Sequence, residues 1–445
     1  MRVLIVGAGW VGITMSVLFS SSHKVTLLDI DAQRIEQISV GETPIVEPGI
    51  TEGLLESVKE GLIRPVLPSD TIGYQDVIVI CVGTPESPDG QVDLQYIESA
   101  INTILSRIDE LCYEYCVVVL KSTVPPGTTR SFLINQVKEN QLDDRVGIVF
   151  NPEFLREGSA LADASNPDRV VIGAIDDQSF NQVRTMYEQV LLNKSTPYLS
   201  MSPESAELCK YASNSFLAMK ISFSNEIANV AESVPYADID DVMRGVGADH
   251  RITAKFFGSG AGFGGSCFPK DIQGLVRFAE ERSIQMPLLR ATQQVNSQRP
   301  KKLVDMLVKK TGNLHGKKIT LLGLAFKPGT NDIRESPTLR LLDLLLELGA
   351  KVWIHDPLVT SMDVSKHLRE NATISAELEE CMRESHGCIL VTDWPIYLEI
   401  GLENLTRFMS KRVLIDGRRV FATQTTPNDV FYQTVGIQAL ESGKE

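Results

Sequence analysis

The sequence predicts an α/β protein with two Rossmann-like, doubly wound parallel-sheet domains joined by a long central helix and a helical middle segment. Short apolar runs alternate with helical stretches both before residue 200 and after residue 300, and such alternation favours parallel sheets. The length of 445 residues suits about three packed units at roughly 150 residues each. We therefore expect an α/β domain over 1–199, a helical segment over 200–300 and a second α/β domain over 301–445.

The composition is typical of a globular protein with a large core, with 43% hydrophobic and 22% charged residues. A net charge of −14 opposes attraction to nucleic acid or an anionic membrane, so we expect neither partner. No apolar run approaches the ~20 residues of a membrane span, and the first residues indicate a strand rather than a cleavable leader. The seven cysteines lack a paired C-x-x-C spacing, which argues against disulfides and a zinc site and favours a reducing cytoplasm.

The chain begins with a strand, glycine turn, helix and strand. The apolar run 2–6 leads into Gly7-Ala8-Gly9-Trp10-Val11-Gly12, a helical stretch continues to about residue 20, and the run 25–28 ends at Asp29. Glycines in such a turn let backbone N–H groups approach a pyrophosphate at a helix N-terminus. Asp29 would accept hydrogen bonds from the ribose hydroxyls and repel a 2′-phosphate, which favours NAD over NADP. The alternative is a turn that binds FAD or nothing.

Three more apolar runs, 77–82, 116–120 and 146–150, predict buried strands that end in polar loops. Ligands of parallel sheets gather at the carboxyl ends of the strands. Thr84, Thr123 and Glu153 follow these ends directly. Glu157 lies four residues after Glu153, a spacing that exposed helix charges would also give.

A long helix should begin at Ser202 and run to about residue 233. The serine, the proline and the acid that follow one another there suit the N-cap and the first turn of a helix. Its apolar face includes Leu208 and Phe216, whereas Lys210 and Asn214 lie four apart on another face. A lysine and an asparagine on a helix are usually solvated, so spacing alone leaves their role open.

The glycine-rich stretch 260–271 ends in Cys267-Phe268-Pro269-Lys270-Asp271. Pro269 suits the first turn of a helix, which places Cys267 just ahead of a helix N-terminus. The helix dipole and the Lys270 ammonium would both favour the nucleophilic thiolate. Asp271 would lie one turn below the sulfur, within range of a shared water. The alternative is a buried cysteine that acts as a small hydrophobic residue.

The third segment repeats the strand and helix pattern without a GxGxxG turn, so it need not bind a dinucleotide. Strands are expected at 318–322, 352–354, 388–391 and 413–415, and a helix at 339–348 after a start at Ser336. The loop after the first strand carries Lys327 and Arg334, which could meet a phosphate or belong to a plain surface loop.

Eight motifs in this order resemble the UDP-glucose/GDP-mannose dehydrogenase family, and most closely its UDP-glucose 6-dehydrogenases. They are GAGWVG at 7–12, Gly83-Thr84-Pro85, STVP at 122–125, FNPEFLREGSA at 150–160, NPDRVVIG at 166–173, GFGGSCFPKD at 262–271, FKPGTNDIRES at 326–336 and IDGRR at 415–419. The match spans nearly the whole chain. Two departures are Trp10, where the family usually has tyrosine, and Ser159, where threonine is commoner.

The resemblance implies an NAD-dependent, four-electron oxidation of UDP-glucose to UDP-glucuronate, a nucleotide sugar used in polysaccharide biosynthesis. It implies that Cys267 attacks the aldehyde, that the second oxidation leaves a thioester, and that water hydrolyses it. Lys210 and Asn214 would stabilise the oxyanion, Asp271 would handle a proton through water, and Thr123 and Glu153 would position that water. It also implies a homodimer or larger homo-oligomer built on the central helix.

The resemblance further implies two sets of binding residues. The cofactor contacts would be Gly7, Gly9, Trp10, Val11, Gly12, Asp29, Arg34, Thr84, Thr123, Glu157, Lys270 and Arg334. The nucleotide-sugar contacts would be Glu153, Phe154, Leu155, Lys210, Asn214, Arg251, Phe256, Gly258, Gly262, Gly264, Phe326, Lys327 and Arg418, with Arg251 reaching across from the partner subunit. No metal is implied.

Two rival functions stay open. A related nucleotide-sugar dehydrogenase, acting on GDP-mannose, would also carry a GGSC-x-PKD loop. Relatives acting on N-acetylmannosamine nucleotides tend to have histidine before the cysteine, where this chain has Ser266. From a different class, a non-catalytic NAD-binding regulatory protein would be expected to lose Cys267, Lys210 or Asp271, and all three are present.

Overall fold

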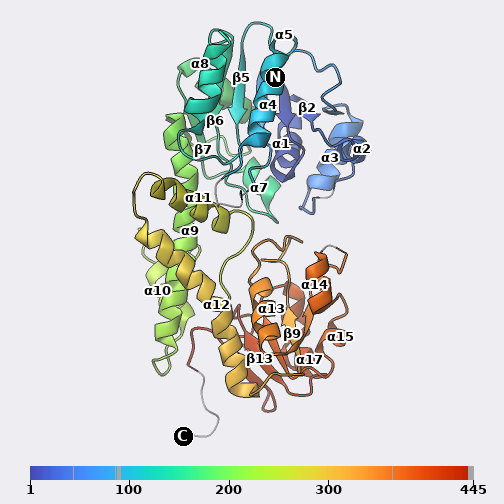
Figure 1. Cartoon of the computed structure of the whole chain (residues 1–445), viewed down its shortest axis with the longest axis vertical. Helices are drawn as coiled ribbons and strands as arrows, with labels where there is room; N and C mark the ends of the chain where they lie inside the picture. The colour runs from blue at the N-terminus through green and yellow to red at the C-terminus, as the bar shows by residue number, and fades with distance from the viewer. Residues whose placement is uncertain (44, 86, 88–91, 363, 439–445) are drawn as a thin grey trace. The chain divides into compact units, whose positions relative to one another are not determined.

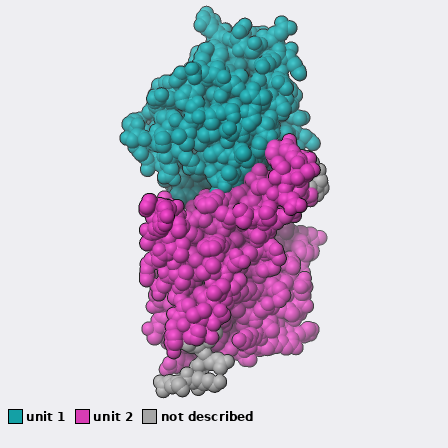
Figure 2. Space-filling model, turned by 90° about the vertical axis from the view of Figure 1, so that its left-hand side faces the viewer, with its two compact units in different colours: residues 1–213 teal, residues 214–445 magenta. Residues whose placement is uncertain are grey.

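The computed structural model describes residues 1–438 apart from 44, 86, 88–91 and 363. The chain forms two compact units, unit 1 (residues 1–213) and unit 2 (residues 214–445), which Figure 2 shows in different colours. Helix α9 (Pro203–Ala231) runs through the boundary between them. The three-segment division at 199 and 300 stays a prediction.

Unit 1 is an α/β layer structure on one sheet, and Figure 1 shows its elements. Its strands are β1 (Arg2–Val6), β2 (Lys24–Leu28), β3 (Ile63–Val66), β4 (Val77–Ile80), β5 (Cys116–Leu120), β6 (Val146–Phe150), β7 (Val170–Ala174) and β8 (Tyr198–Met201). Its helices before α9 are α1 (Trp10–Ser20), α2 (Ala32–Ser39), α3 (Ile50–Lys59), α4 (Gln95–Ser106), α5 (Ile108–Leu111), the π-helical turn η1 (Thr129–Ile134), α6 (Asn135–Glu139), α7 (Ala160–Ser165) and α8 (Asp177–Val190). The strand order is β3-β2-β1-β4-β5-β6-β7-β8, parallel except for the antiparallel pair β6 and β7.

Successive side chains of a strand point to opposite faces of the sheet, and in the inner strands β1, β4, β5 and β6 the side chains on both faces are buried. In β1, Val3 and Ile5 join one apolar cluster with α1, α3, α7 and α8. Leu4 and Val6 join a second cluster with α4, α5, η1 and α6. Burial on both sides explains why the strands are continuous apolar runs, and it leaves the ends of the strands for ligands.

Unit 2 contains a second sheet with the order β11-β10-β9-β12-β13-β14, and all its pairs are parallel. Its strands are β9 (Lys318–Leu322), β10 (Lys351–His355), β11 (Ala372–Ser375), β12 (Gly387–Leu390), β13 (Val413–Asp416) and β14 (Phe431–Thr434). Its helices after α9 are α10 (Ile239–Gly247), α11 (Phe268–Glu280), α12 (Pro287–Thr311), α13 (Pro337–Glu347), α14 (Lys366–Asn371), α15 (Leu378–Met382), α16 (Pro395–Ile400) and α17 (Leu402–Thr406).

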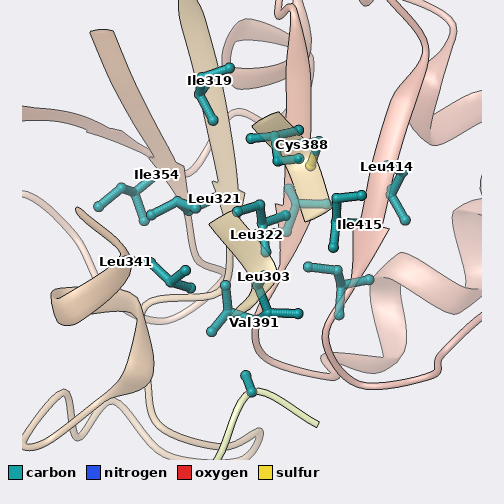
Figure 3. Close-up of a cluster of buried hydrophobic side chains, with 14 of the residues drawn as sticks. Leu303, Ile319, Leu321, Leu322, Leu341, Ile354, Cys388, Val391, Leu414 and Ile415 are labelled. Atoms are coloured by element: carbon teal, nitrogen blue, oxygen red, sulfur yellow. The ribbon is translucent and has the colours of Figure 1, made fainter. Parts of the chain in front are cut away.

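The core of unit 2 lies between this sheet and its helices. Figure 3 shows Leu303 of α12 and Leu341 of α13 near Leu322, the last residue of β9, and Val391, which directly follows β12. Each of these four side chains is buried. At about 25 cal/mol per Å² of apolar area removed from water, such packing supplies the main stabilisation of the unit.

The predicted fold class is confirmed, and the strands expected in both α/β regions are present with ends shifted by at most two residues. The antiparallel β6 and β7 pair was not expected, nor were the short strands β3, β8, β11 and β14. Pro300, where the sequence suggested a new segment, lies inside helix α12. Because proline has no backbone N–H to donate, α12 lacks one hydrogen bond of its ladder at this buried position.

Candidate active site

The glycine turn after β1 has the geometry that a dinucleotide needs. Gly7 has a φ of +102°, a conformation that side-chain-bearing residues rarely adopt. A Cβ on Gly12 would lie 1.8 Å from the Gly7 carbonyl oxygen, so only glycine lets α1 begin this close to the turn. A Cβ on Gly9 would meet no atom within 4 Å among the described residues. The turn therefore leaves room at the α1 N-terminus, where a pyrophosphate fits.

Asp29 follows β2, as predicted for an acid that contacts the ribose. One of its carboxylate oxygens accepts a hydrogen bond from Ala8 N at 2.6 Å, and the other accepts one from Asp31 N at 2.9 Å. Arg34, on α2, lies 3.7 Å from the carboxylate. The acid is thus fixed beside the glycine turn, and its remaining lone pairs suit hydroxyl donors.

Glu47 is a residue of this region that the sequence analysis missed. Its buried carboxylate accepts hydrogen bonds from Trp10 Nε1 at 2.9 Å and from Gly158 N at 2.6 Å. It also accepts one from Ala160 N at 3.2 Å, at the start of α7. Glu47 therefore ties the glycine turn to the loop that carries Glu157. The only sequence signal was Trp10, whose indole N–H needs an acceptor when buried.

Glu153 and Lys210 form a buried ion pair in unit 1. Lys210 Nζ lies 2.6 Å from Glu153 Oε1 and 2.6 Å from the Glu153 carbonyl oxygen. Glu153 Oε2 accepts a hydrogen bond from Leu155 N at 2.7 Å. Burial acts to raise the pKa of Glu153, but the Lys210 charge, the hydrogen bonds and the more distant Lys121 charge together lower this pKa below its usual value. Glu153 is therefore an ionised acceptor.

Two interpretations of the surrounding sequence need correction. Residues 151–156 form no helix, so Glu153 and Glu157 are not a pair of exposed helix charges. Leu208 and Phe216, which the spacing assigned to an apolar face, are 47% and 57% exposed. Lys210 is only 2% and Asn214 only 7% exposed, so these two polar side chains are buried rather than solvated.

The other predicted residues of unit 1 lie at the carboxyl ends of its strands or beside them. Thr84 follows β4, Thr123 follows β5, and both are partly buried. The ring of Phe154 lies 5.4 Å from Lys210 Nζ. These placements bring Thr84, Thr123 and the Glu153 pair to one edge of the sheet.

Cys267 occupies the N-cap position of α11, with Pro269 in the first turn, as the sequence predicted. Asp271, in the same turn, is buried and accepts a hydrogen bond from Asn214 Nδ2 at 2.6 Å. Lys270 Nζ lies 3.5 Å from the Asp271 carboxylate. The positive end of the helix dipole favours the negatively charged thiolate. The partly exposed Cys267 differs from the five buried cysteines of the chain.

The glycines before Cys267 pack against the loop after β9. A Cβ on Gly265 would lie 2.8 Å from the ring of Phe326, and one on Gly264 would lie 2.2 Å from the Glu335 carbonyl oxygen. Gly265 N also donates a hydrogen bond to the Arg334 carbonyl oxygen at 2.9 Å. The structure thus brings Gly264 and Phe326, two predicted substrate residues, into contact.

The remaining predicted residues of unit 2 are more dispersed. Arg418 Nε donates a hydrogen bond to the Val391 carbonyl oxygen at 2.6 Å at the end of β12, and burial lowers the pKa of Arg418. Arg334 pairs with Asp332 at 2.7 Å, and Arg251 pairs with Asp249 at 2.5 Å. Phe256 has a φ of +68°, and Gly258 and Gly262 lie in the loop ahead of Cys267. Lys327 Nζ lies 5.4 Å from the Phe326 ring.

Two kinds of feature do not occur within the described residues. No group of three or more His, Cys, Asp and Glu side chains is arranged to hold a metal ion there. In the same part of the chain, no helix is long and apolar enough to cross a membrane.

The glycine turn, Asp29 and the strand order are typical of a dinucleotide-binding α/β protein. Comparison with known proteins identifies the family to which this protein belongs. Models of the UDP-glucose/GDP-mannose dehydrogenase family match three regions: the NAD binding domain at residues 1–191, the central domain at 204–298 and the UDP binding domain at 320–423. The chain belongs to the UDP-glucose/GDP-mannose dehydrogenase family. This confirms the resemblance, the dehydrogenase class and NAD as the cofactor.

Individual relatives agree over nearly the full length. The chain is 37% identical to the UDP-glucose 6-dehydrogenase TuaD of Bacillus subtilis (strain 168), with 95% of this chain and 90% of that protein covered. It is 35% identical to a UDP-glucose 6-dehydrogenase of Rhizobium meliloti (strain 1021), with 98% and 99% covered. A solved UDP-glucose dehydrogenase from Pyrobaculum islandicum is 36% identical, with a TM-score of 0.86 and 97% and 96% covered.

Proposed function

We propose that this chain oxidises UDP-glucose to UDP-glucuronate in two successive steps, each coupled to one NAD. The observation that carries the proposal is Cys267 at the N-terminus of α11, beside the Lys270, Asp271 and Asn214 cluster. A thiolate at a helix N-terminus is a nucleophile suited to an aldehyde carbon. The family membership and the glycine turn supply the dehydrogenase context.

NAD, when bound, accepts a hydride from the substrate carbon at each oxidation. After the first oxidation, the Cys267 thiolate adds to the aldehyde carbon, and its S–C bond gives a thiohemiacetal. Loss of the second hydride converts this adduct to a thioester. Water then attacks the thioester carbon, the S–C bond breaks, and the carboxylate leaves while Cys267 recovers its thiolate. The water supplies the second oxygen atom of the carboxylate.

The other candidate catalytic residues take distinct roles in the proposal. The Lys210 ammonium and the Asn214 amide, one turn apart on α9, stabilise the oxyanion of each addition step. Asp271 exchanges a proton with the reacting oxygen through a water. Glu153, whose pKa is lowered although burial opposes this, can only accept hydrogen bonds, so it orients the hydrolytic water together with Thr123.

Binding residues complete the proposal. Gly7, Gly9, Gly12 and Asp29 hold the cofactor, together with Trp10, Val11, Arg34, Thr84, Glu157, Lys270 and Arg334. The sugar nucleotide contacts Phe154, Leu155, Phe256, Gly258, Gly262, Gly264, Phe326, Lys327 and Arg418, in addition to Glu153, Lys210 and Asn214. We place the enzyme in the cytoplasm, because all seven cysteines, which lie in the described part of the chain, carry free thiols.

A homodimer is part of the proposal. Phe216, Phe223 and Val230 are 57%, 45% and 57% exposed. They recur every seven residues and therefore lie on one face of α9. Such a face on a helix this long suits a second copy of the chain. The Arg251 of one chain would then serve the site of the other.

Subunit mixing tests the shared site. Arg251→Ala and Cys267→Ala chains should each be inactive alone, and their mixture should recover activity because one composite site per mixed dimer stays intact. If no activity returns although subunit exchange is demonstrated, Arg251 acts within its own chain.

The substrate is tested by following NADH formation with UDP-glucose, GDP-mannose and UDP-N-acetylhexosamines side by side. We expect UDP-glucose to give the highest kcat/KM, with two NADH formed per sugar. A preference for GDP-mannose would make the chain a GDP-mannose dehydrogenase. Binding of NAD without turnover of any of these sugars would favour a regulatory protein.

The mechanism is tested at Cys267. Cys267→Ser should fold, bind NAD and UDP-glucose, and lose turnover by about a thousandfold or more, because a hydroxyl is a far weaker nucleophile than a thiolate. It should slowly accumulate a sugar ester, visible as a mass shift on the peptide with residue 267. Cys267→Ala should form neither adduct nor acid. If Cys267→Ala made UDP-glucuronate within about tenfold of the parent rate, hydration of a bound aldehyde would be the better mechanism.

A further inference from the structure

Loop 258–265, the glycine-rich loop ahead of Cys267, contains no helix or strand. Asn296 of α12 holds it at one point. Asn296 Oδ1 accepts a hydrogen bond from Phe263 N at 2.8 Å, and Asn296 Nδ2 donates one to the Phe263 carbonyl oxygen at 3.0 Å. A single side chain thus satisfies both backbone polar groups of Phe263, which fixes the orientation of that peptide segment.

Gly260 of the same loop is held in the same way by two other side chains. Gly260 N donates a hydrogen bond to Asn225 Oδ1 at 2.7 Å, and its carbonyl oxygen accepts one from Arg299 Nε at 2.8 Å. Arg299 also donates to Asn229 Oδ1 at 2.9 Å. Because Arg299 and Asn225 are both buried, their positions are set by the packing of α9 and α12.

The two fixed points enclose the tightest part of the loop. Gly262 has a φ of +102°, and a Cβ there would lie 2.6 Å from Asn296 Oδ1. Asn296 and Arg299 are three residues apart on α12 and therefore face the same side. One helix face thus holds the loop at Gly260 and Phe263, on both sides of Gly262, where only glycine fits.

We propose that Asn296 and Arg299 are positioning residues that hold loop 258–265 in the conformation that binds the sugar nucleotide. This inference rests on the proposed function, because it assumes that Gly262 and Gly264 contact that substrate. Neither side chain needs to touch the substrate. Their effect is transmitted through the backbone of Gly260 and Phe263.

The test compares the parent enzyme with Asn296→Ala and with Ser297→Ala. Ser297 is exposed on the same helix, and among the residues that the structure describes its hydroxyl bonds only to the Gln294 carbonyl oxygen, at 2.9 Å. Asn296→Ala should raise the KM for UDP-glucose about tenfold, as expected for two lost hydrogen bonds. The KM for NAD and the kcat should stay within about threefold. Ser297→Ala should match the parent in every constant.

Amide hydrogen exchange of the same proteins, followed on peptides that cover residues 258–266, gives a readout that needs no activity. Exchange in Asn296→Ala should be at least about tenfold faster there and unchanged in α11. Arg299→Lys keeps the buried charge. It should also raise the KM for UDP-glucose and speed amide exchange over residues 258–266. Unchanged exchange in Asn296→Ala, or faster exchange without a change in KM for UDP-glucose, would overturn the proposal. If the parent enzyme does not oxidise UDP-glucose, the proposed function fails, and the exchange rates still decide whether Asn296 holds the loop.

Discussion

The sheets of the two units share one construction over six strands. The order β3-β2-β1-β4-β5-β6 in unit 1 corresponds to β11-β10-β9-β12-β13-β14 in unit 2. A glycine follows the first strand of each, Gly7 with a φ of +102° and Gly323 with a φ of +99°. Each donates its N–H to the last carbonyl of the second strand, at 2.8 Å to Leu28 and 2.7 Å to His355. An aspartate follows that strand in both units.

The two aspartates differ in what they bind. Asp29 accepts two backbone N–H groups beside Arg34 and is partly accessible. Asp356 is fully buried. Its carboxylate accepts hydrogen bonds from five groups of its own unit, namely the backbone N–H groups of Leu324, Ala325, Leu358 and Val359 and the Trp394 indole N–H.

The same strand order thus carries two kinds of acid, so topology alone does not define a dinucleotide site. In unit 2 the acid that would meet a ribose is saturated by internal donors, so it contributes to the fold instead. In unit 1 the same position retains acceptor capacity beside an open glycine turn. Fold and site are therefore separable in this chain.

The largest expected effect is on the stability of unit 2. Asp356→Ala should lower its free energy of unfolding by about 3 kcal/mol or more, because several buried donors lose their acceptor at once. Denaturant unfolding, with exchange of unit 2 peptides as a local probe, measures it. The matched variant Asp29→Ala should cost unit 1 only about 1 kcal/mol. Equal losses in the two units would remove the distinction between a structural and a ligand-facing acid.

Cofactor choice is the next effect. The parent should prefer NAD over NADP by at least about tenfold, or ~1.4 kcal/mol, because the Asp29 carboxylate repels a 2′-phosphate. Asp29→Asn keeps the size of the side chain and removes the charge, so it should narrow the ratio of the two kcat/KM values. Asp356→Asn should leave that ratio alone. An unchanged ratio in Asp29→Asn would show that Asp29 does not face the ribose.

A smaller effect is expected at the link between the glycine turn and the Glu157 loop. Trp10→Phe removes the indole N–H that Glu47 accepts, and one such bond is worth about 1 kcal/mol. The KM for NAD should rise about fivefold, while the KM for UDP-glucose stays near that of the parent. If the KM for UDP-glucose changed instead, Glu47 would support the substrate loop rather than the cofactor turn.

The smallest effect concerns pH. Burial lowers the pKa of His355 below its usual value of 6.5, against hydrogen bonding to the Ala376 carbonyl oxygen and nearby acids that raise it. The folded state therefore binds fewer protons than the unfolded state below pH 6.5. The stability of unit 2 should be full above this pH and fall as the pH drops through it toward the folded pKa. His355→Gln should flatten this dependence, measured by unfolding between about pH 7.5 and 5.5. An identical slope in the variant would assign the dependence to other groups.

The long apolar strands could be predicted from the sequence, because burial on both faces of a parallel sheet requires apolar residues at every position. The short strands could not. Ile63–Val66 contains an arginine and a proline, and β14 is only half-buried, so their strand character comes from pairing with a neighbour. The reversed direction of β7 also depends on its partner β6 rather than on its own sequence.

The parts of the candidate site that depend on neighbouring residues in the chain could also be predicted from the sequence. The glycine turn and the N-cap position of Cys267 depend on residues adjacent in the chain, and both are where the sequence placed them. The contacts of Lys210 and Asn214 join residues 57 positions apart, so spacing on α9 could not reveal them. Glu47 was missed because nothing near it in the sequence indicates its three donors.

Calorimetric titration of the full-length protein with NAD shows whether each chain has one dinucleotide site, in the first sheet only. We expect one NAD bound per chain. Asp29→Ala should weaken that binding by about tenfold or more. Gln293→Ala, a control substitution in unit 2 away from Asp29 and Asp356, should leave the affinity for NAD unchanged. Two NAD per chain, or unchanged affinity in Asp29→Ala, would contradict this expectation.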